Sequence, residues 1–183
     1  MAMIIGVTGT FGSGKTTAAK LLAKRLNCGV LDADKIAKDV FAAKKNGIMA
    51  VFGTTSRKKI AGIVFSDRKK LRKLNEIIHP SVLDILQSRS EMRNNIIWDV
   101  PLLIETEAHK IVDRVVVVKC DEKVRLERLG KKGFTSKEIK QRTRSQFSIT
   151  KKIKHADFVI DNSRFMDDTK NQVSIVVKKI LNN

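Results

Sequence analysis

Residues 9–16, GTFGSGKT, place three of the chain's ten glycines between an apolar run and a run with helical spacing. The apolar run, residues 3–8, predicts a short buried strand, and the Ala and Leu residues of Lys15–Leu26 predict a helix. Glycines allow successive main-chain N–H groups to curl around an anion, and the start of a helix adds a positive dipole. The pattern is GxxxxGK[ST] in its proper context, so it predicts binding of a nucleoside triphosphate.

The motif also assigns a role to each part of the loop. We expect Lys15 to reach the β- and γ-phosphates and the Thr16 hydroxyl to complete the coordination of Mg²⁺. The motif alone does not separate a kinase from an ATPase, a GTPase or a helicase. The predicted nucleotide-binding residues are Gly9, Thr10, Phe11, Gly12, Ser13, Gly14, Lys15, Thr16 and Thr17.

Further apolar runs alternate with helical patterns along the 183-residue chain. The predicted strands span residues 3–8, 29–34, 94–100, 113–120 and 156–162. The predicted helices span residues 15–26, 35–44, 58–75, 81–92, 122–129, 137–146 and 167–181. This alternation predicts one α/β domain over residues 1–183, with a five-stranded parallel sheet flanked by helices. Residues 35–94 are too long for a plain crossover, so we expect them to form a helical subdomain inserted over the strand ends.

Carboxylates follow two of the predicted strands. Asp32 and Asp34 end the second strand, and Asp99 ends the third. Ligands of open parallel sheets lie beyond the carboxyl ends of the strands, where phosphoryl transfer to a hydroxyl needs one carboxylate as base and another near Mg²⁺. The alternatives are structural: Asp34 could cap the following helix, Asp99 could be a turn residue before Pro101, and Asp32 is better explained as a structural residue.

A basic block, residues 131–154, contains nine Lys and Arg against one Glu. Arginines on a mobile helix can close over a triphosphate and neutralise its charge. We therefore expect this block to be a lid, with Arg142, Arg144 and Lys152 as candidate cations, together with Arg128 at the end of the preceding predicted helix. The alternative for each is a solvated basic surface.

The net charge of +18 favours an anionic partner, although a Lys-biased proteome would also produce it. A nucleic-acid-binding ATPase would need aromatic platforms, yet the chain has no Tyr and its single Trp98 lies in a predicted strand, so we do not expect nucleic acid as partner. No apolar stretch approaches the roughly 18–20 residues that span a bilayer. Two separated cysteines and the absence of a basic leader fit a cytoplasmic protein without membrane association.

Several segments resemble the dephospho-coenzyme A kinase family in content and order. They are VTGTFGSGKTTAAKLLA, LDADKIAKDV, IVFSDRKKLRKLNEIIHPSV, DVPLLIE, DRVVVV and RTRSQFSITKKIKHADFVIDNS, which together run from residue 4 to about residue 163. The resemblance implies a P-loop small-molecule kinase with a helical substrate domain and a lid. It implies transfer of the γ-phosphate of ATP, with Mg²⁺, to the ribose 3′-hydroxyl of dephospho-coenzyme A.

The same resemblance implies that Asp34 is the base and that Arg142 is the lid arginine, acting with Lys15. It further implies an acceptor site lined by Thr8, Asp34, His79, Asp99, Pro101 and Leu102. The chain departs from the family pattern in a shorter segment at residues 44–56, in Lys132 at the start of the lid and in Ile104. A structural alternative for the His79-Pro80 pair is that Pro80 opens a helix. Shikimate- and nucleoside-monophosphate-type kinases remain alternative assignments.

Overall fold

The computed structural model describes residues 3–91 and 95–182. The chain divides into two compact units, one formed by Met1–Asp32 with Ser90–Asn183 and the other by Ala33–Arg89. The first unit contains the sheet and the phosphate loop, and the second contains helices only within its described residues. The strand predicted to begin at residue 94 and the helix predicted to end at residue 92 each have that terminal residue outside the described part of the chain.

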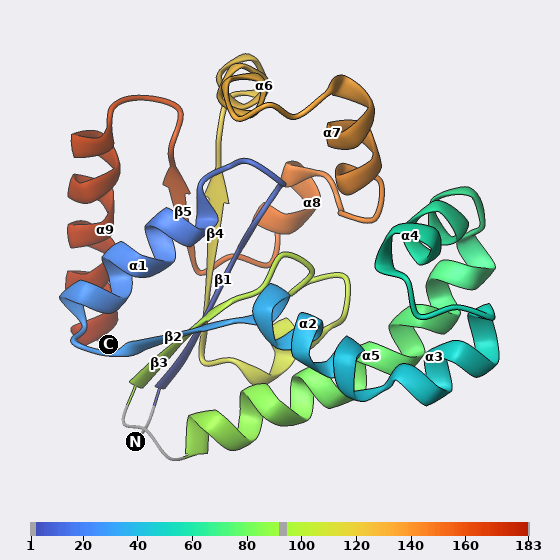
Figure 1. Cartoon of the computed structure of the whole chain (residues 1–183). Helices are drawn as coiled ribbons and strands as arrows, with labels where there is room; N and C mark the ends of the chain where they lie inside the picture. The colour runs from blue at the N-terminus through green and yellow to red at the C-terminus, as the bar shows by residue number, and fades with distance from the viewer. Residues whose placement is uncertain (1–2, 92–94, 183) are drawn as a thin grey trace. The chain divides into compact units, whose positions relative to one another are not determined.

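The first unit is built on a five-stranded parallel sheet with strand order β2-β3-β1-β4-β5, which confirms the predicted fold class (Figure 1). The strands are β1 (Met3–Gly9), β2 (Gly29–Asp32), β3 (Asn95–Asp99), β4 (Arg114–Lys119) and β5 (Phe158–Asp161). The four valines of β4 are all buried, as expected for a strand covered on both faces. Because β1 lies between β3 and β4, the strand order reverses at β1, with β2 and β3 on one side and β4 and β5 on the other, and the phosphate loop begins at this point.

One face of the sheet is covered by α1 (Lys15–Arg25) and α9 (Met166–Leu181), which lie side by side (Figure 1). Their buried residues form one core with alternate strand residues, including Ile5, Val7 and Val116. Side chains of a strand alternate between its faces, so Thr8 points away from this core. The opposite face meets α8 (Ile149–Ile153), whose Lys152 contacts Thr8.

The segment predicted as the lid follows α6 (Glu122–Lys131) and contains α7 (Ser136–Thr143) and α8. Thr135 caps α7 in a capping box with Glu138: each side chain accepts the main-chain N–H of the other residue. A 3₁₀ helix, η1 (Ala108–Ile111), precedes β4. Neither α8 nor η1 was predicted, because runs of four or five residues are too short to show periodicity.

The second unit contains α2 (Ala33–Ala43), α3 (Lys45–Phe52), α4 (Arg57–Ser66) and most of α5 (Arg68–Glu91). The single helix predicted over residues 58–75 is wrong, since Asp67 interrupts it. The Asp67 carboxylate accepts the main-chain N–H groups of Lys69 and Lys70, at 2.8 and 3.1 Å, and so starts a new helix. The structural alternative in which Pro80 opens a helix is also wrong, because Pro80 lies inside α5.

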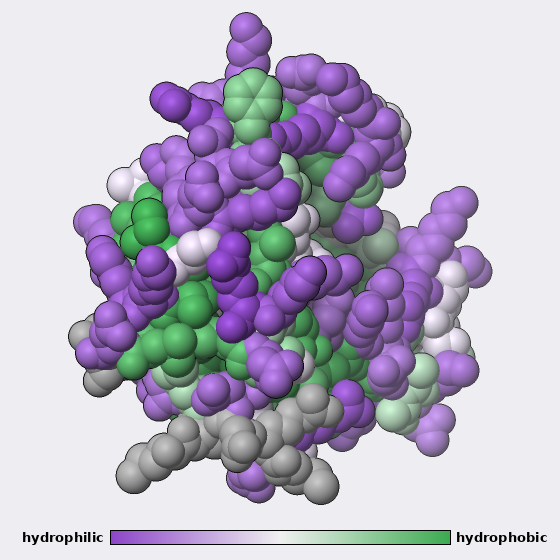
Figure 2. Space-filling view, turned by 90° about the vertical axis from the view of Figure 1, so that its left-hand side faces the viewer, coloured by the Kyte–Doolittle hydropathy of each residue, from purple (hydrophilic) through white to green (hydrophobic). Residues whose placement is uncertain are grey.

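Hydrophilic residues cover most of the face that Figure 2 shows, and hydrophobic residues gather near its middle. Among the described residues, none of the helices combines the length and apolar character needed to cross a membrane.

Candidate active site

The phosphate loop connects the end of β1 to the start of α1. Gly12 and Gly14 have φ values of +85° and +88°, a left-handed conformation that residues with a Cβ rarely adopt. Gly14 is the N-cap of α1 and has no side chain with which to cap the N–H groups of the first turn. Since the first turn also carries no acidic residue, the helix start offers main-chain N–H groups and a positive dipole to an anion.

The loop is packed so closely that a methyl group in place of a glycine hydrogen would collide with its neighbours. A Cβ on Gly9 would lie 2.3 Å from the Val118 carbonyl oxygen, and one on Gly12 would lie 2.7 Å from Leu129. Inside the loop, the main-chain N–H of Ser13 donates to the Thr10 carbonyl at 3.0 Å and closes a turn. Glycine is therefore required here by space as well as by backbone conformation.

Three predicted site residues meet at the carboxyl edge of the sheet. Lys15 Nζ lies 2.9 Å from Asp99 Oδ1, and Thr16 Oγ1 donates to Asp99 Oδ2 at 2.5 Å. Asp99 ends β3, directly beside Val7 of β1, and only 1% of its side chain is exposed. Thr17 follows in the first turn of α1 and is exposed.

The donor set of this cluster fits Mg²⁺, which prefers oxygen ligands and is usually bound by one or two carboxylates together with substrate phosphates. Thr16 and Asp99 supply a hydroxyl and a carboxylate beside the phosphate loop. Within the described ranges there is no group of three His, Cys, Asp or Glu residues that could hold a metal on its own.

The turn after β5 contacts the main chain of the phosphate loop, an arrangement that the sequence analysis did not predict. Asn162 Nδ2 donates to the Ser13 carbonyl at 2.8 Å, while Asn162 Oδ1 accepts the hydroxyl of Thr169 at 2.9 Å. Arg128, a candidate lid cation, donates instead to the carbonyls of Asn162 and Arg164, at 2.6 and 3.1 Å. In this structure Arg128 thus fixes the turn that supports the phosphate loop.

Arg142 of α7 lies against the phosphate loop, with its guanidinium over the ring of Phe11. Its guanidinium is 5.0 Å from the centroid of the Phe11 ring and 5.2 Å from that of Phe134. The two rings meet edge to face with centroids 5.2 Å apart. From the other side, buried Arg125 donates to the Phe11 carbonyl at 3.0 Å. Arg142 is exposed, so its guanidinium remains accessible beside the loop.

Lys152, the other candidate lid cation, is not a solvent-facing charge. Its side chain is fully buried and forms an ion pair with Glu105 at 2.8 Å. Its ammonium also donates to Thr8 Oγ1 at 3.3 Å and to the Pro101 carbonyl at 2.9 Å. Thr8 is buried as well, and its hydroxyl donates to the same Pro101 carbonyl at 3.2 Å. In this structure the Lys152 ammonium is therefore engaged within the protein.

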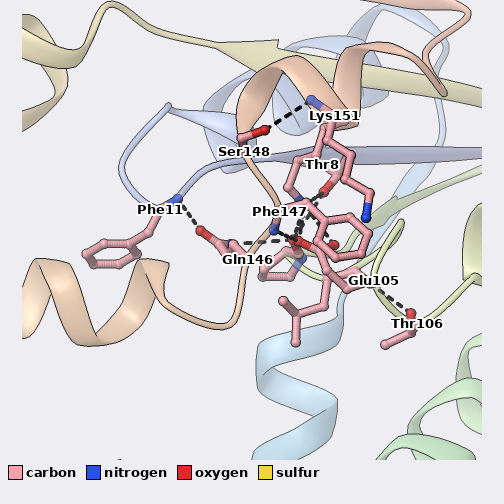
Figure 3. A network of polar contacts seen from close by, with 11 residues as sticks. Thr8, Phe11, Glu105, Thr106, Gln146, Phe147, Ser148 and Lys151 are labelled. Atoms are coloured by element: carbon pink, nitrogen blue, oxygen red, sulfur yellow. Dashed lines mark hydrogen bonds and ion pairs between the residues drawn. The ribbon is translucent and has the colours of Figure 1, made fainter.

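Gln146 and Phe147, which precede α8, connect the cluster around Lys152 with the phosphate loop. Gln146 Oε1 accepts the main-chain N–H of Phe11 at 2.8 Å, and Figure 3 shows the Gln146 side chain directed at that nitrogen. The main-chain N–H of Phe147 donates to Glu105 Oε1 at 2.6 Å. Neither residue was singled out from the sequence, and only Glu105 carried a signal, as a charged residue closing the apolar run DVPLLIE.

The remaining predicted residues divide between the units. Leu102 follows β3 in the first unit and is half-buried. Asp34 and His79 belong to the second unit, where Asp34 is exposed in the first turn of α2 and His79 lies half-buried in α5. Burial lowers the pKa of His79 below its usual range. Since α2 begins at Ala33, Asp34 is inside the helix and is not its N-cap.

Comparisons with known proteins give a consistent result. The profile of the family described as dephospho-CoA kinase matches residues 3–168. A dephospho-CoA kinase of Fusobacterium nucleatum is 40% identical over 179 residues, covering 91% of this chain and 92% of its own. One of Bacillus cereus is 36% identical over 196 residues, covering 98% of each chain.

Solved structures agree in fold. The structure of TT1252 from Thermus thermophilus superposes with a TM-score of 0.85 at 28% identity, over 98% of both chains. A shikimate kinase from Acinetobacter baumannii reaches a TM-score of 0.59 at 19% identity, covering 100% of this chain and 95% of its own, a likeness that concerns the fold alone.

Proposed function

Because the chain belongs to the dephospho-CoA kinase family, it is a kinase, and we propose that it transfers the γ-phosphoryl group of ATP to the ribose 3′-hydroxyl of dephospho-coenzyme A. The products are coenzyme A and ADP. The observation that carries the proposal from within the structure is the cluster of Lys15, Thr16 and Asp99 beside a phosphate loop. A cation, a hydroxyl and a carboxylate at this edge are the groups that phosphoryl transfer requires.

The donor site follows from these residues. The main-chain N–H groups of the loop and of the first turn of α1 bind phosphate oxygens, and Lys15 neutralises the β- and γ-phosphates. Thr16 and Asp99 would hold Mg²⁺ directly or through water molecules. When bound, the ion would supply positive charge that offsets the charge of the phosphates. Asp99 now pairs with Lys15, so nucleotide binding would exchange this ion pair for contacts with the cation and the phosphates.

In the proposed mechanism Asp34 is the general base. It lies two residues after Asp32, the last residue of β2, so the main chain leads to it directly from the carboxyl edge of the sheet. Asp34 is exposed and carries a carboxylate able to accept the proton of the acceptor hydroxyl. His79, Leu102, Pro101 and Thr8 are assigned to acceptor binding by family resemblance. Thr8 would contribute through the Pro101 segment that it holds, because its own hydroxyl is buried.

Arg142 is proposed to stabilise the transferring phosphoryl group. Its position over the Phe11 ring places a guanidinium beside the loop that binds the phosphates. A guanidinium can contact two phosphate oxygens at once, which suits charge that spreads over the equatorial oxygens during transfer. Stacking on Phe11 and Phe134 limits the side-chain freedom that Arg142 would lose on binding.

A coupled assay of ADP release tests this function. Purified protein with MgATP should turn over dephospho-coenzyme A much faster than shikimate, nucleoside monophosphates or DNA, and mass spectrometry should detect coenzyme A. Lys15→Ala should abolish turnover, whereas Lys20→Ala, which changes an exposed lysine of the same helix, should leave it unchanged. Comparable rates with another acceptor, or full activity of a folded Lys15→Ala variant, would contradict the proposal.

A further inference from the structure

Lys152 is the most deeply buried charged side chain among the described residues, with none of it exposed. A buried ammonium is tolerated only when it is paired and its N–H groups are hydrogen-bonded. An ammonium has three such donors, and those of Lys152 are directed at Glu105, Thr8 and Pro101. All of its donors are therefore used within the protein, in contacts that join α8 to Thr8 of β1 and to the segment after β3.

Glu105 holds the same segment at a second point. One carboxylate oxygen accepts the main-chain N–H of Phe147 at 2.6 Å, and both oxygens lie within 2.9 Å of Lys152 Nζ. Phe147 immediately precedes the N-cap of α8, and Lys152 lies in the last turn of this helix. One side chain thus fixes both ends of this short helix. Figure 3 shows Glu105, Thr8 and Phe147 gathered in this network.

The anchored segment is directly joined to the groups that touch the phosphate loop. Gln146, the neighbour of Phe147, accepts the main-chain N–H of Phe11, and its amide nitrogen lies 3.4 Å from the Pro101 carbonyl. Arg142 lies four residues earlier, in α7, with its guanidinium over the Phe11 ring. A shift of the anchored end would therefore displace both side chains from the loop.

The charge of Glu105 matters as well as its shape. Burial lowers the pKa of Lys152 below its usual range, Glu105 opposes this shift, and the positive charge of Lys15 adds to it. Lys15 is thus near enough for the two cations to repel each other. Glu105 compensates a positive charge that would otherwise compete with Lys15 beside the phosphate loop.

We propose that Glu105 and Lys152 are positioning residues, a buried ion pair that anchors the end of the lid segment at residues 146–153 and so places Gln146 and Arg142 on the phosphate loop. The proposal rests on the proposed kinase function in that part of its test measures kcat with dephospho-coenzyme A. Neither residue contacts the reacting atoms: Glu105 acts through Phe147 and Lys152, and Lys152 acts through α8 and the Pro101 segment.

The test compares Glu105→Gln, Lys152→Met and the double variant with the wild-type chain. Glu105→Gln keeps the shape and an acceptor for Phe147, but it leaves the Lys152 ammonium unneutralised. We expect each single variant to lower kcat about 10- to 100-fold, since displacement of about 1 Å at a catalytic group can cost that much. The dissociation constant for MgATP should change less than about threefold, because the phosphate loop itself is intact. The double variant should be no slower than the slower single variant, because the two residues act as one unit.

A matched control is Glu127→Gln, which removes the exposed ion pair with Lys131 at 2.8 Å in α6 and should leave kcat unchanged. Hydrogen–deuterium exchange supplies a readout that does not depend on turnover. Peptides covering residues 142–153 should exchange faster in Lys152→Met, while those from β1 and β4 should not change. If the wild-type chain does not phosphorylate dephospho-coenzyme A, the proposed function fails, and the exchange data still decide whether the pair anchors the segment.

Gln146→Ala provides a second variant in case the buried substitutions prevent folding. Gln146 is half-buried, so its truncation should leave the melting temperature almost unchanged while lowering kcat in the same range. Single variants that melt lower but keep kcat within twofold of the wild type, per folded molecule, would show that the pair is merely structural. Independent, multiplicative losses in the double variant, or unchanged exchange at residues 142–153, would also overturn the proposal.

Discussion

Gly14 and Asn162 are in such close contact that replacing one of them should change the loss of stability caused by replacing the other. A Cβ on Gly14 would lie 2.0 Å from Asn162 Nδ2, far inside van der Waals contact. Gly14→Ala must therefore push the Asn162 amide away from the Ser13 carbonyl and the Thr169 hydroxyl, which it contacts at 2.8 and 2.9 Å. We expect the substitution both to destabilise the fold and to weaken binding of MgATP.

The magnitudes follow from two terms. The left-handed backbone of Gly14 costs about 1–2 kcal/mol for a residue with a Cβ. Displacing a buried amide from its hydrogen bonds costs about 1–3 kcal/mol. Asn162→Ala alone should lose the second term, again about 1–3 kcal/mol. In the double variant the clash is absent and the amide is lost only once, so the total should fall short of the sum of the single costs by the amide term, about 1–3 kcal/mol.

Urea unfolding of the four proteins, followed by circular dichroism, measures these free energies, and calorimetry measures the dissociation constant for MgATP. Each kcal/mol corresponds to about 2–4 °C in the melting temperature of a chain of this size. Gly130→Ala is the control, because a Cβ there would meet no heavy atom within 4 Å and its φ is not left-handed. Additivity of the two costs within about 0.5 kcal/mol would refute the reasoning.

Three further outcomes are expected. Arg142→Ala should lower kcat about 10²-fold or more, and Arg142→Lys should not restore it, since an ammonium cannot make the forked contact; wild-type kcat in both variants would contradict this role. Asp34→Asn should retain the fold and lower kcat about 10²- to 10⁴-fold, whereas near-normal turnover would move the base to Asp32 or Asp99. Burial and the charge of neighbouring His155 lower the pKa of His109, whose Nδ1 has no hydrogen-bond partner within the described part of the chain. Below about pH 6.5 the unfolded chain therefore binds more protons than the folded protein, so the free energy of unfolding should fall as the pH falls through that value. Urea unfolding at pH 7.5 and at pH 5.5 measures this loss, which should be smaller in His109→Gln than in the wild-type chain.

The sheet and the phosphate loop were predictable because their signals are local. The strands are continuous apolar runs, and the loop carries its glycines and Lys15 at fixed spacing, so neighbouring residues alone specify them. Asp99 was predictable for a different reason: parallel strands bring their carboxyl ends to one edge, and the pairing of Val7 with Asp99 places this carboxylate beside the loop. Helix boundaries were less well predicted where a single side chain decides them, as Asp67 does between α4 and α5.

The roles of the basic residues near the loop could not be read from the sequence, because they depend on partners far along the chain. Lys151 and Lys152 are neighbours of the same type, yet Lys151 is exposed with its ammonium over the Phe147 ring, and Lys152 is buried against Glu105, 47 residues away. Helical geometry turns adjacent residues to different faces, and only tertiary contacts determine which face is buried.

Phe11 shows the same limit at a position where the loop motif allows any residue. Its main-chain N–H is accepted by Gln146, its carbonyl accepts from Arg125, and its ring stacks with Arg142. The first two contacts use the main chain and do not require phenylalanine, so no residue preference would reveal them in a sequence. The third depends on the ring and concerns the proposed catalytic arginine. The phosphate loop is therefore held by α6 and the lid segment through its backbone, while the identity of residue 11 influences the placement of the cation that we assign to the transferring phosphoryl group.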